Sequence, residues 1–254
     1  MEILIGCSGF GRQLARYSQD FSLQELENTF FRMPRPAEGR KLKELVPADF
    51  TFSLQAWQLI THSPPYTRLG KPPKLAREEK LGHLQLSRDV RAAWKRTVAV
   101  AEALAARYVV LRTPTSFAPS QESRDRLSAF VQTLGPFPFT LVWEPAGAWQ
   151  ANQVFHLCQE LKILPAVDPL LTESPIEAPA LTEGPRWMGK EAYFRLPGGG
   201  FFGDDYDDFR LEQLLSICQN YEKCVCVFTN VHKIRSARRF KELVNGAQPA
   251  APLP

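Results

Sequence analysis

Short β-rich runs alternate with segments of helical periodicity along this chain, and that alternation limits the available folds more than any other feature. Eight runs are strand-like: Ile3–Gly9, Glu25–Phe31, Phe50–Ala56, Tyr108–Thr113, Thr140–Glu144, Leu164–Asp168, Ala192–Leu196 and Val225–Asn230. Between most of them, apolar residues recur every three or four positions, as in Val98, Ala101 and Leu104. Such alternation is typical of parallel strands joined by crossover helices. Eight units in 254 residues predict an α/β protein with a single (β/α)8 TIM-type barrel over residues 1–245.

The remaining composition indicates a cytoplasmic protein with no membrane partner. No apolar run approaches the roughly 20 residues of a membrane span. The first residues lead straight into a strand pattern without the basic flank of a signal peptide. Five cysteines without a Cys-x-x-Cys pair predict reduced structural thiols. Residues 246–254 are rich in Ala and Pro and predict a disordered tail. The oligomeric state is left open.

Two stretches carry most of the excess positive charge. Residues 66–96 hold nine Lys or Arg against three acids, and residues 233–241 hold five cations and no acid. Blocks of this kind usually form a solvated face, and the alternative is a face that binds a polyanion such as nucleic acid.

Polar residues gather where the predicted strands end, which is where barrels of this type place their sites. Each has an ordinary structural explanation alone, but together they predict a pocket. The catalytic candidates are Glu25, His62, Glu144 and Asp168, and the ligand-binding candidates are Ser8, Thr29, Gln55, Arg112, Arg195 and Asn230. A carboxyl such as Glu144 at a strand end can act as a general base or bind a hydroxyl. A lone histidine such as His62 is more often structural than functional.

The segment Glu25–Phe31 is unusual because an alternating strand would place Glu25 and Glu27 on one face with Thr29 and Phe31. A buried acid needs a partner or a ligand. The alternative is that Glu25 lies in the preceding loop and is solvated.

The sequence gives weaker indications of a metal site or a phosphate site than of a polar pocket. The four histidines have no paired spacing, so no cofactor is required by the sequence, although a single Mg²⁺ on Glu25, Glu144 and Asp168 stays open. Residues 198–200 are three glycines after the seventh strand and form a candidate anion cradle. Four aspartates at 204, 205, 207 and 208 would repel an anion there, which favours a hinge loop instead.

Several ordered motifs resemble those of the domain-of-unknown-function 72 family, the YecE-like proteins. The matching segments are Ile5–Phe10, Glu25–Pro34, Phe50–Ser53 with Thr61-His62, Pro114–Phe117, Glu144 with Trp149, Asp168-Pro169, Arg195 and Asn230. The resemblance covers about residues 3–244 and implies a TIM-type barrel. It supplies no settled reaction. By analogy alone, it suggests an endonuclease IV-like or sugar isomerase-like site.

The departures from the family pattern identify a divergent member. Relative to the family, Glu27 replaces Asn, Gln55 replaces Lys, Arg112 replaces Gln, Ala146 replaces Arg, Pro197 replaces His and Thr229 replaces Asn. A buried pair of Arg112 with Glu27, or with Glu144, would compensate for these changes, and we expect the partner to be Glu27.

Three functions are therefore open. The first is a strand-end pocket that binds a phosphate-bearing ligand, including nucleic acid, with hydrolysis or isomerisation as the reaction. The second is a non-catalytic binding or scaffold protein with a degenerate site. The third is a sugar-phosphate isomerase or hydrolase.

Overall fold

Eight parallel strands close into a barrel in sequential order, β1 to β8, which confirms the predicted fold class. The computed structural model describes residues 1–9, 13–63, 81–170, 189–198 and 205–247. The strands are β1 (Glu2–Gly9), β2 (Leu23–Leu26), β3 (Thr51–Gln55), β4 (Tyr108–Thr113), β5 (Thr140–Pro145), β6 (Leu164–Val167), β7 (Glu191–Leu196) and β8 (Lys223–Phe228). The helices described are α1 (Leu14–Asp20), α2 (Asn28–Phe31), α3 (Pro36–Lys43), α4 (Gln58–Thr61), α5 (Arg88–Leu104), α6 (Gln121–Leu134), α7 (Ala151–Leu161), α10 (Asp208–Cys218) and α11 (Lys233–Ala247).

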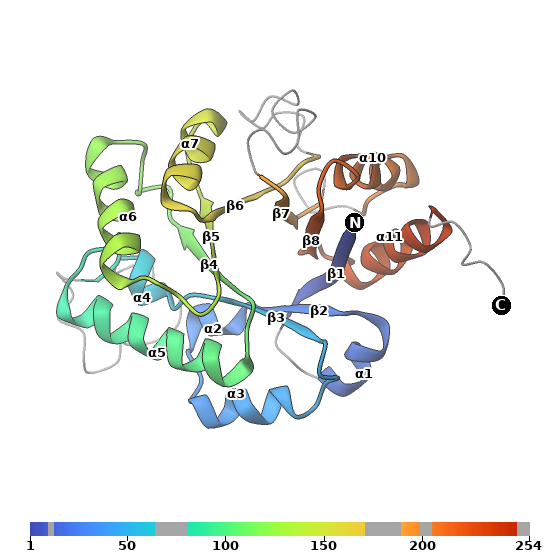
Figure 1. Cartoon of the computed structure of the whole chain (residues 1–254), viewed down its shortest axis with the longest axis horizontal. Helices are drawn as coiled ribbons and strands as arrows, with labels where there is room; N and C mark the ends of the chain where they lie inside the picture. Colours follow the sequence, from blue (N-terminus) through green and yellow to red (C-terminus); the bar gives the residue numbers. More distant parts are fainter. Residues whose placement is uncertain (10–12, 64–80, 171–188, 199–204, 248–254) are drawn as a thin grey trace.

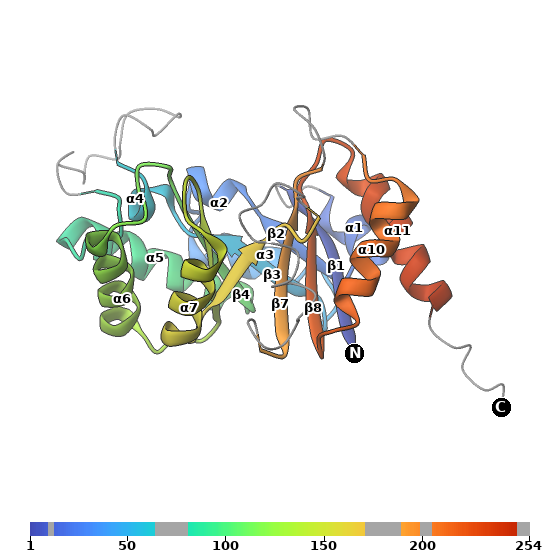
Figure 2. The same ribbon diagram turned by 90° about the horizontal axis from the view of Figure 1, so that it is seen from above.

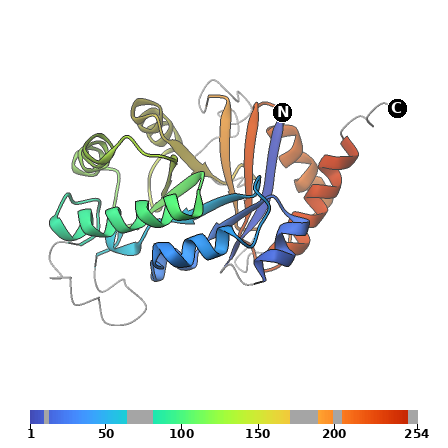
Figure 3. The ribbon, with the colours of Figure 1, turned by 60° about the horizontal axis from the view of Figure 1, so that its bottom comes forward.

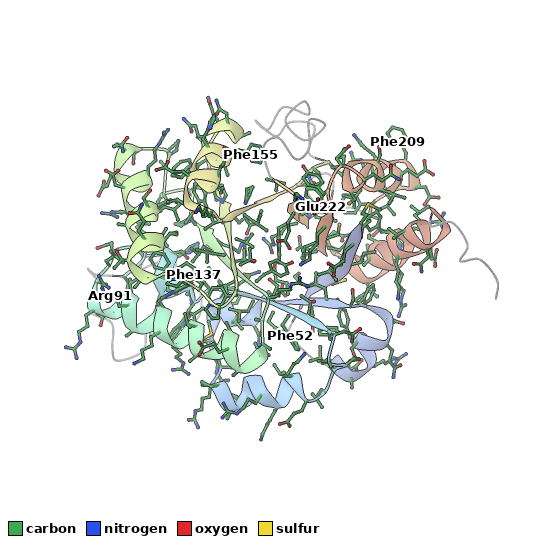
Figure 4. All side chains as sticks on the ribbon, viewed as in Figure 1. Phe52, Arg91, Phe137, Phe155, Phe209 and Glu222 are labelled. Atoms are coloured by element: carbon green, nitrogen blue, oxygen red, sulfur yellow. The ribbon has the colours of Figure 1, made fainter. Side chains whose placement is uncertain are left out.

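The longer helices surround the barrel and cover the outward face of its strands (Figure 1). α3 and α5 lie side by side on one flank (Figure 3), and α10 and α11 lie side by side on another (Figure 2). Side-chain caps start several of them: Ser87 accepts from the Val90 N–H at α5, and Asp207 accepts from the Arg210 N–H at α10. Large side chains such as Phe52 and Phe155 are fully buried in this outer layer (Figure 4).

Alternation along the strands sorts side chains into an outer layer and a barrel interior. On β4, Tyr108 and Val110 belong to the interior cluster, which also contains Val142, Tyr193 and Val225. Continuing the same alternation, Arg112 on β4 and Arg195 on β7 face inward one step further along. The interior is therefore a packed core whose polar end lies at the carboxyl ends of the strands.

The opposite end of the barrel is closed by a smaller polar group. Lys223 Nζ donates to the Tyr108 hydroxyl at 2.5 Å, and that hydroxyl donates to Glu191 Oε1 at 2.6 Å. Lys223 and Glu191 also form an ion pair at 2.8 Å. These residues begin β4, β7 and β8, so the hydrogen bonds tie three strand starts together across the barrel.

Six of the predicted strands differ from the observed ones by one or two residues at an end, and the second strand and the tail differ in ways that matter to the site and to the domain limits. The second strand was expected over Glu25–Phe31, but β2 ends at Leu26 and the chain turns into α2, whose preceding residue Glu27 has helical backbone angles. Glu25, Glu27, Thr29 and Phe31 therefore do not share one strand face. The tail was expected from residue 246, but α11 continues through Ala247. Residues 248–254 lie outside the described part of the chain.

Two further observations bear on the sequence predictions. All five cysteines are buried and unpaired, as expected for structural thiols. Within the described residues, no helix combines the length and the apolar character that crossing a bilayer demands.

Candidate functional site

Five polar side chains from five strands form a closed ring of hydrogen bonds at the carboxyl ends of the strands. We call it the mouth ring, and it consists of Glu25, Gln55, Arg112, Glu144 and Arg195. All five are among the candidates predicted from the sequence. They come from β2, β3, β4, β5 and β7.

Glu25 is the most deeply buried member of the mouth ring. Its carboxylate has no exposed surface, so it depends on protein donors. Gln55 Nε2 donates to Oε1 at 2.7 Å, Arg195 Nη2 donates to the same oxygen at 3.0 Å, and the Tyr193 hydroxyl donates to Oε2 at 2.9 Å. Tyr193 in turn lies 2.8 Å from the Ser53 hydroxyl. The reading of Glu25 as a solvated loop residue is wrong.

Glu144 is held between two guanidinium groups. Arg112 Nε donates to Oε2 at 2.5 Å, and Arg195 Nη1 donates to Oε1. The strand register explains the first contact, because Arg112 and Glu144 stand directly opposite each other on β4 and β5. Burial would raise the pKa of Glu144, but the two guanidinium groups outweigh it and hold the pKa below its usual range.

The two arginines of the mouth ring are neutralised by its two carboxylates. Arg195 is 8% exposed and pairs with both Glu25 and Glu144. Despite its burial, the pKa of Arg195 is raised by these carboxylates. Arg112 also reaches Gln55 Oε1 at 3.4 Å. The ring as a whole therefore carries no net formal charge.

The expected Glu27–Arg112 pair is wrong, since Arg112 pairs with Glu144. Glu27 lies beyond the end of β2, and among the described residues it forms an ion pair with Lys233, 4.0 Å away at the start of α11. Lys233 Nζ also donates to the Ser8 hydroxyl at 3.3 Å. Arg112, which replaces a family Gln, is thus neutralised by the alternative partner, Glu144.

A cavity of about 490 Å³ opens above the mouth ring, and we call it the mouth cavity. Its lining includes Arg112, Glu144 and Arg195 from the ring, together with Glu27 and Asp168. Trp149, Pro197 and Thr229 complete other parts of the wall. The sequence candidates from β4, β5, β6 and β7 therefore meet in one place.

Asp168 is the carboxyl in the mouth cavity with a raised pKa. Burial raises its pKa to about 6, against the opposing effects of the Leu170 N–H, which donates to Oδ1 at 2.9 Å, and of Arg210. A carboxyl with this pKa is largely ionised at neutral pH and yet basic enough to take a proton. Its environment differs sharply from that of Glu144, which two cations keep ionised.

His62 lies in a neighbouring pocket of about 390 Å³, which we call the side pocket. Its Nδ1 is 2.8 Å from the Thr61 hydroxyl, and its ring meets Phe30 edge-on at 5.0 Å. Burial, with smaller contributions from Arg112 and His83, lowers the pKa of His62 to about 4. The imidazole is therefore uncharged at neutral pH.

Three of the predicted ligand-binding residues are engaged elsewhere. The Thr29 hydroxyl lies 2.7 Å from the carbonyl oxygens of Leu26 and Gln55, where it fastens α2 to β3. Asn230 Nδ2 donates to the Ser236 hydroxyl at 3.0 Å. Ser8 accepts from Lys233. None of the three is among the residues that line the mouth cavity.

Sequence reasoning missed Tyr193 and the direct role of Lys233. Tyr193 sits in an apolar run, yet it stands two residues before Arg195 and so shares its strand face. That spacing was the available signal. Lys233 was counted only as part of a basic stretch.

The Mg²⁺ site left open on Glu25, Glu144 and Asp168 is not formed. Arg195 lies between the two glutamates and bonds to both. Among the described residues, no group of three or more His, Cys, Asp or Glu side chains is placed to hold a metal ion.

The basic stretch at residues 233–241 is largely offset by acids within the fold. Arg238 pairs with Asp20 at 2.6 Å, and Arg239 pairs with Asp208 at 2.8 Å. Further contacts in the same stretch join Arg235 to Asp205, Lys233 to Glu27, and Lys241 Nζ to the Asp20 carbonyl oxygen. Residues 64–80, which contain much of the other basic stretch, lie outside the described residues.

The glycine cradle is described only at its first residue. The Gly198 N–H donates to the Tyr206 hydroxyl at 2.8 Å, so this donor is already used. Residues 199–204 lie outside the described part of the chain.

The fold and the mouth ring define a (β/α)8 barrel with a polar site at the carboxyl ends of its strands. The family model described as "Protein of unknown function DUF72" matches residues 6–254. The chain therefore belongs to this family. No curated protein sequence matches it.

Solved structures agree with that assignment at the level of the fold. A DUF72 family protein from Enterococcus faecalis is similar, with 16% identity, a TM-score of 0.72, and coverage of 96% of this chain and 98% of the other. One from Thermotoga maritima has 17% identity and a TM-score of 0.67, over 96% and 100%. Endonuclease IV from Thermus thermophilus has 14% identity and a TM-score of 0.57, over 97% and 100%.

A D-psicose 3-epimerase, crystallised in the presence of D-fructose, is also similar, with 11% identity and a TM-score of 0.61 over 97% of this chain and 99% of the other. At these identities the likeness establishes the barrel and leaves the reaction to the chemistry of the site.

Proposed function

We propose that the mouth cavity binds a small hydroxylated molecule of the sugar class and that Asp168 transfers a proton on it. The cavity of about 490 Å³ falls within the roughly 300–1,000 Å³ of small-molecule sites. Its wall offers carboxylate acceptors on Glu27, Glu144 and Asp168 and guanidinium donors on Arg112 and Arg195. A hydroxyl group both donates and accepts, so a mixed wall of this kind suits a polyol.

The neutral mouth ring is the observation that carries the choice of ligand class. Phosphate binding draws on unpaired cations, but Arg112 and Arg195 are both committed to carboxylates. A phosphate-bearing ligand would have to draw Arg112 away from Glu144, and Arg112, with 42% of its side chain exposed, is the more movable of the two. We therefore favour a sugar or a sugar phosphate over a nucleic-acid backbone.

Proton transfer follows from the contrast between the two carboxyls. Glu144 is kept ionised by two cations, which suits it to hold a ligand hydroxyl. Asp168 has a pKa of about 6, which suits a general base that works near neutral pH. Isomerisation and epimerisation begin with the abstraction of a proton next to a carbonyl, and this reaction class requires the fewest catalytic groups in addition to these two carboxyls. The epimerase structure above is consistent with this proposal.

A non-catalytic binding protein is the second candidate. It is favoured by the residues that stand where the family has other side chains, namely Gln55, Ala146, Pro197 and Thr229. Two of them, Pro197 and Thr229, line the mouth cavity itself.

A thermal-shift screen followed by solvent exchange tests the proposal. Aldoses, ketoses, sugar phosphates and oligonucleotides are compared, and a ligand at about 100 times its Kd stabilises the fold by about 2.7 kcal/mol. We expect sugars or sugar phosphates to raise Tm. NMR in D₂O should then show exchange of the carbon-bound hydrogen next to the carbonyl.

Asp168→Asn should keep binding and lose exchange, whereas Asp125→Asn, an exposed residue on α6, should keep both. Stabilisation by oligonucleotides alone would refute the proposal. Binding without exchange in the wild type would support the non-catalytic candidate.

A further inference from the structure

The side pocket adjoins the mouth cavity across the Arg112–Glu144 pair. Both hollows are lined by Arg112, Glu144 and Pro145, so one ion pair forms part of the wall of each. Arg112 is partly exposed, and its guanidinium lies 5.9 Å from the centre of the Phe30 ring. A molecule bound in the mouth cavity can therefore extend past this pair into the side pocket.

The wall of the side pocket is largely apolar and aromatic. Phe30 and Phe31 meet edge-on at 5.1 Å, and the His62 ring packs against Phe30 in the same way. Pro114, Pro145 and Ala146 supply further apolar surface. Phe31 is 38% exposed, although most large apolar side chains of the described residues are buried.

The polar groups of the side pocket are suited to an uncharged ring. His62 is neutral at neutral pH, so it offers one donor and one acceptor nitrogen, and Thr61 engages Nδ1. Thr113 and Thr115 add hydroxyl or backbone groups. Among the described residues of the wall, the full charges belong to Arg112 and Glu144, which neutralise each other.

We propose that the side pocket binds a planar, uncharged ring that is covalently joined to the sugar-class ligand of the mouth cavity. The ligand class is then a ring-bearing sugar, such as a nucleoside or an aryl glycoside. Aromatic side chains stack on planar rings of many kinds, which accounts for an apolar wall with few hydrogen-bonding groups. The proposal rests on the proposed function for the sugar half and on the side pocket for the ring half.

Calorimetric titration of matched ligands tests it. Adenosine, uridine and 4-nitrophenyl glycosides are compared with free ribose and glucose, and with adenine and 4-nitrophenol as rings without a sugar. We expect a ring-bearing sugar to bind at least about tenfold more tightly than the free sugar, because stacking on an aromatic side chain contributes on that scale. Comparing the affinities of the nucleosides and the aryl glycosides identifies which kind of ring the side pocket prefers.

Phe31→Ala should remove most of the gain from the ring and leave affinity for the free sugar unchanged. Phe209→Ala is the matched control, since Phe209 is 74% exposed at the outer edge of α10 (Figure 4) and is not among the residues lining either hollow. Equal affinity for sugars with and without a ring would overturn the inference and leave the proposed function standing. Failure of all three kinds of compound, free rings included, would overturn both proposals. Binding of the free rings alone, lost in Phe31→Ala, would overturn the sugar half and leave the side pocket as a site for a ring.

Discussion

Replacing Arg195 by methionine tests whether the mouth ring holds the barrel together. Methionine keeps much of the length of the side chain and removes the charge, which leaves the fully buried Glu25 without its cation. Removing one partner of a buried ion pair costs about 3–5 kcal/mol. For a chain of this size each kcal/mol lowers Tm by about 2–4 °C, so we expect a drop of roughly 6–20 °C.

The pH dependence of this loss gives a second signature through Glu144. Its pKa is held below the ordinary value of 4.5, so its ion pairs stabilise the fold above that pH, and the contribution is lost as pH falls. Arg195→Met removes one of the two cations responsible. The deficit in the free energy of unfolding should therefore be largest at neutral pH and should shrink below about pH 4.5.

Urea unfolding followed by circular dichroism measures both effects. The double variant Glu25→Gln/Arg195→Met removes the unpaired charge and should recover at least about 1–2 kcal/mol relative to Arg195→Met alone. Arg239→Met is the control. Arg239 pairs with Asp208 on the solvent-exposed surface, so its loss should change the free energy of unfolding far less than the loss of Arg195. If Arg195→Met behaves like this control, or if the double variant recovers nothing, the reasoning is wrong.

Three further predictions follow from other parts of the molecule. The pKa of Asp168 is raised to about 6 from an ordinary 3.8, so the folded protein loses stability as pH rises through this range. Asp168→Asn should therefore raise the free energy of unfolding by up to about 3 kcal/mol at pH 8 and leave it unchanged near pH 3, as measured by urea titration. The five buried thiols should stay unreactive toward a disulfide reagent until the protein is denatured, and rapid labelling of the native state would contradict their burial. Gly6→Ala should lower the free energy of unfolding by more than about 2 kcal/mol, because its Cβ would lie 1.9 Å from the Leu23 carbonyl oxygen. Gly246→Ala, in open space on α11, should raise the free energy of unfolding by up to about 1 kcal/mol, and thermal melts of both variants measure the two effects.

Most of the barrel could be predicted because its signals are local. β-rich runs and helical stripes are properties of neighbouring residues, and β4 was predicted at its observed bounds, Tyr108–Thr113. The failure at Glu27 has a tertiary cause. Residues 28–31 are β-prone in sequence, but their place at the end of a short strand beside β3 makes them a helical turn, fastened by Thr29.

The residues of the mouth ring could be predicted from the sequence, but the hydrogen bonds and ion pairs between them could not. Strand-end position was enough to select Glu25, Gln55, Arg112, Glu144 and Arg195. Which arginine meets which carboxylate depends on strand register and on side-chain reach across the barrel, and neither is written in a single sequence. The opposition of Arg112 and Glu144 across β4 and β5 decided the pairing that sequence reasoning had assigned to Glu27.

The mouth ring also bears on how the barrel comes to be complete. Glu25, Gln55 and Arg112 belong to the first four strands, and Glu144 and Arg195 belong to the last four. The two halves are joined by Arg112 with Glu144 on one side and by Arg195 with Glu25 on the other. A fragment that contains only the first four strands would leave Glu25 without Arg195, whereas Glu144 and Arg195 in the last four strands would keep their own pair. Packing of β7 across the barrel from β2 therefore neutralises a fully buried carboxylate, so the ring favours the whole barrel over its first half.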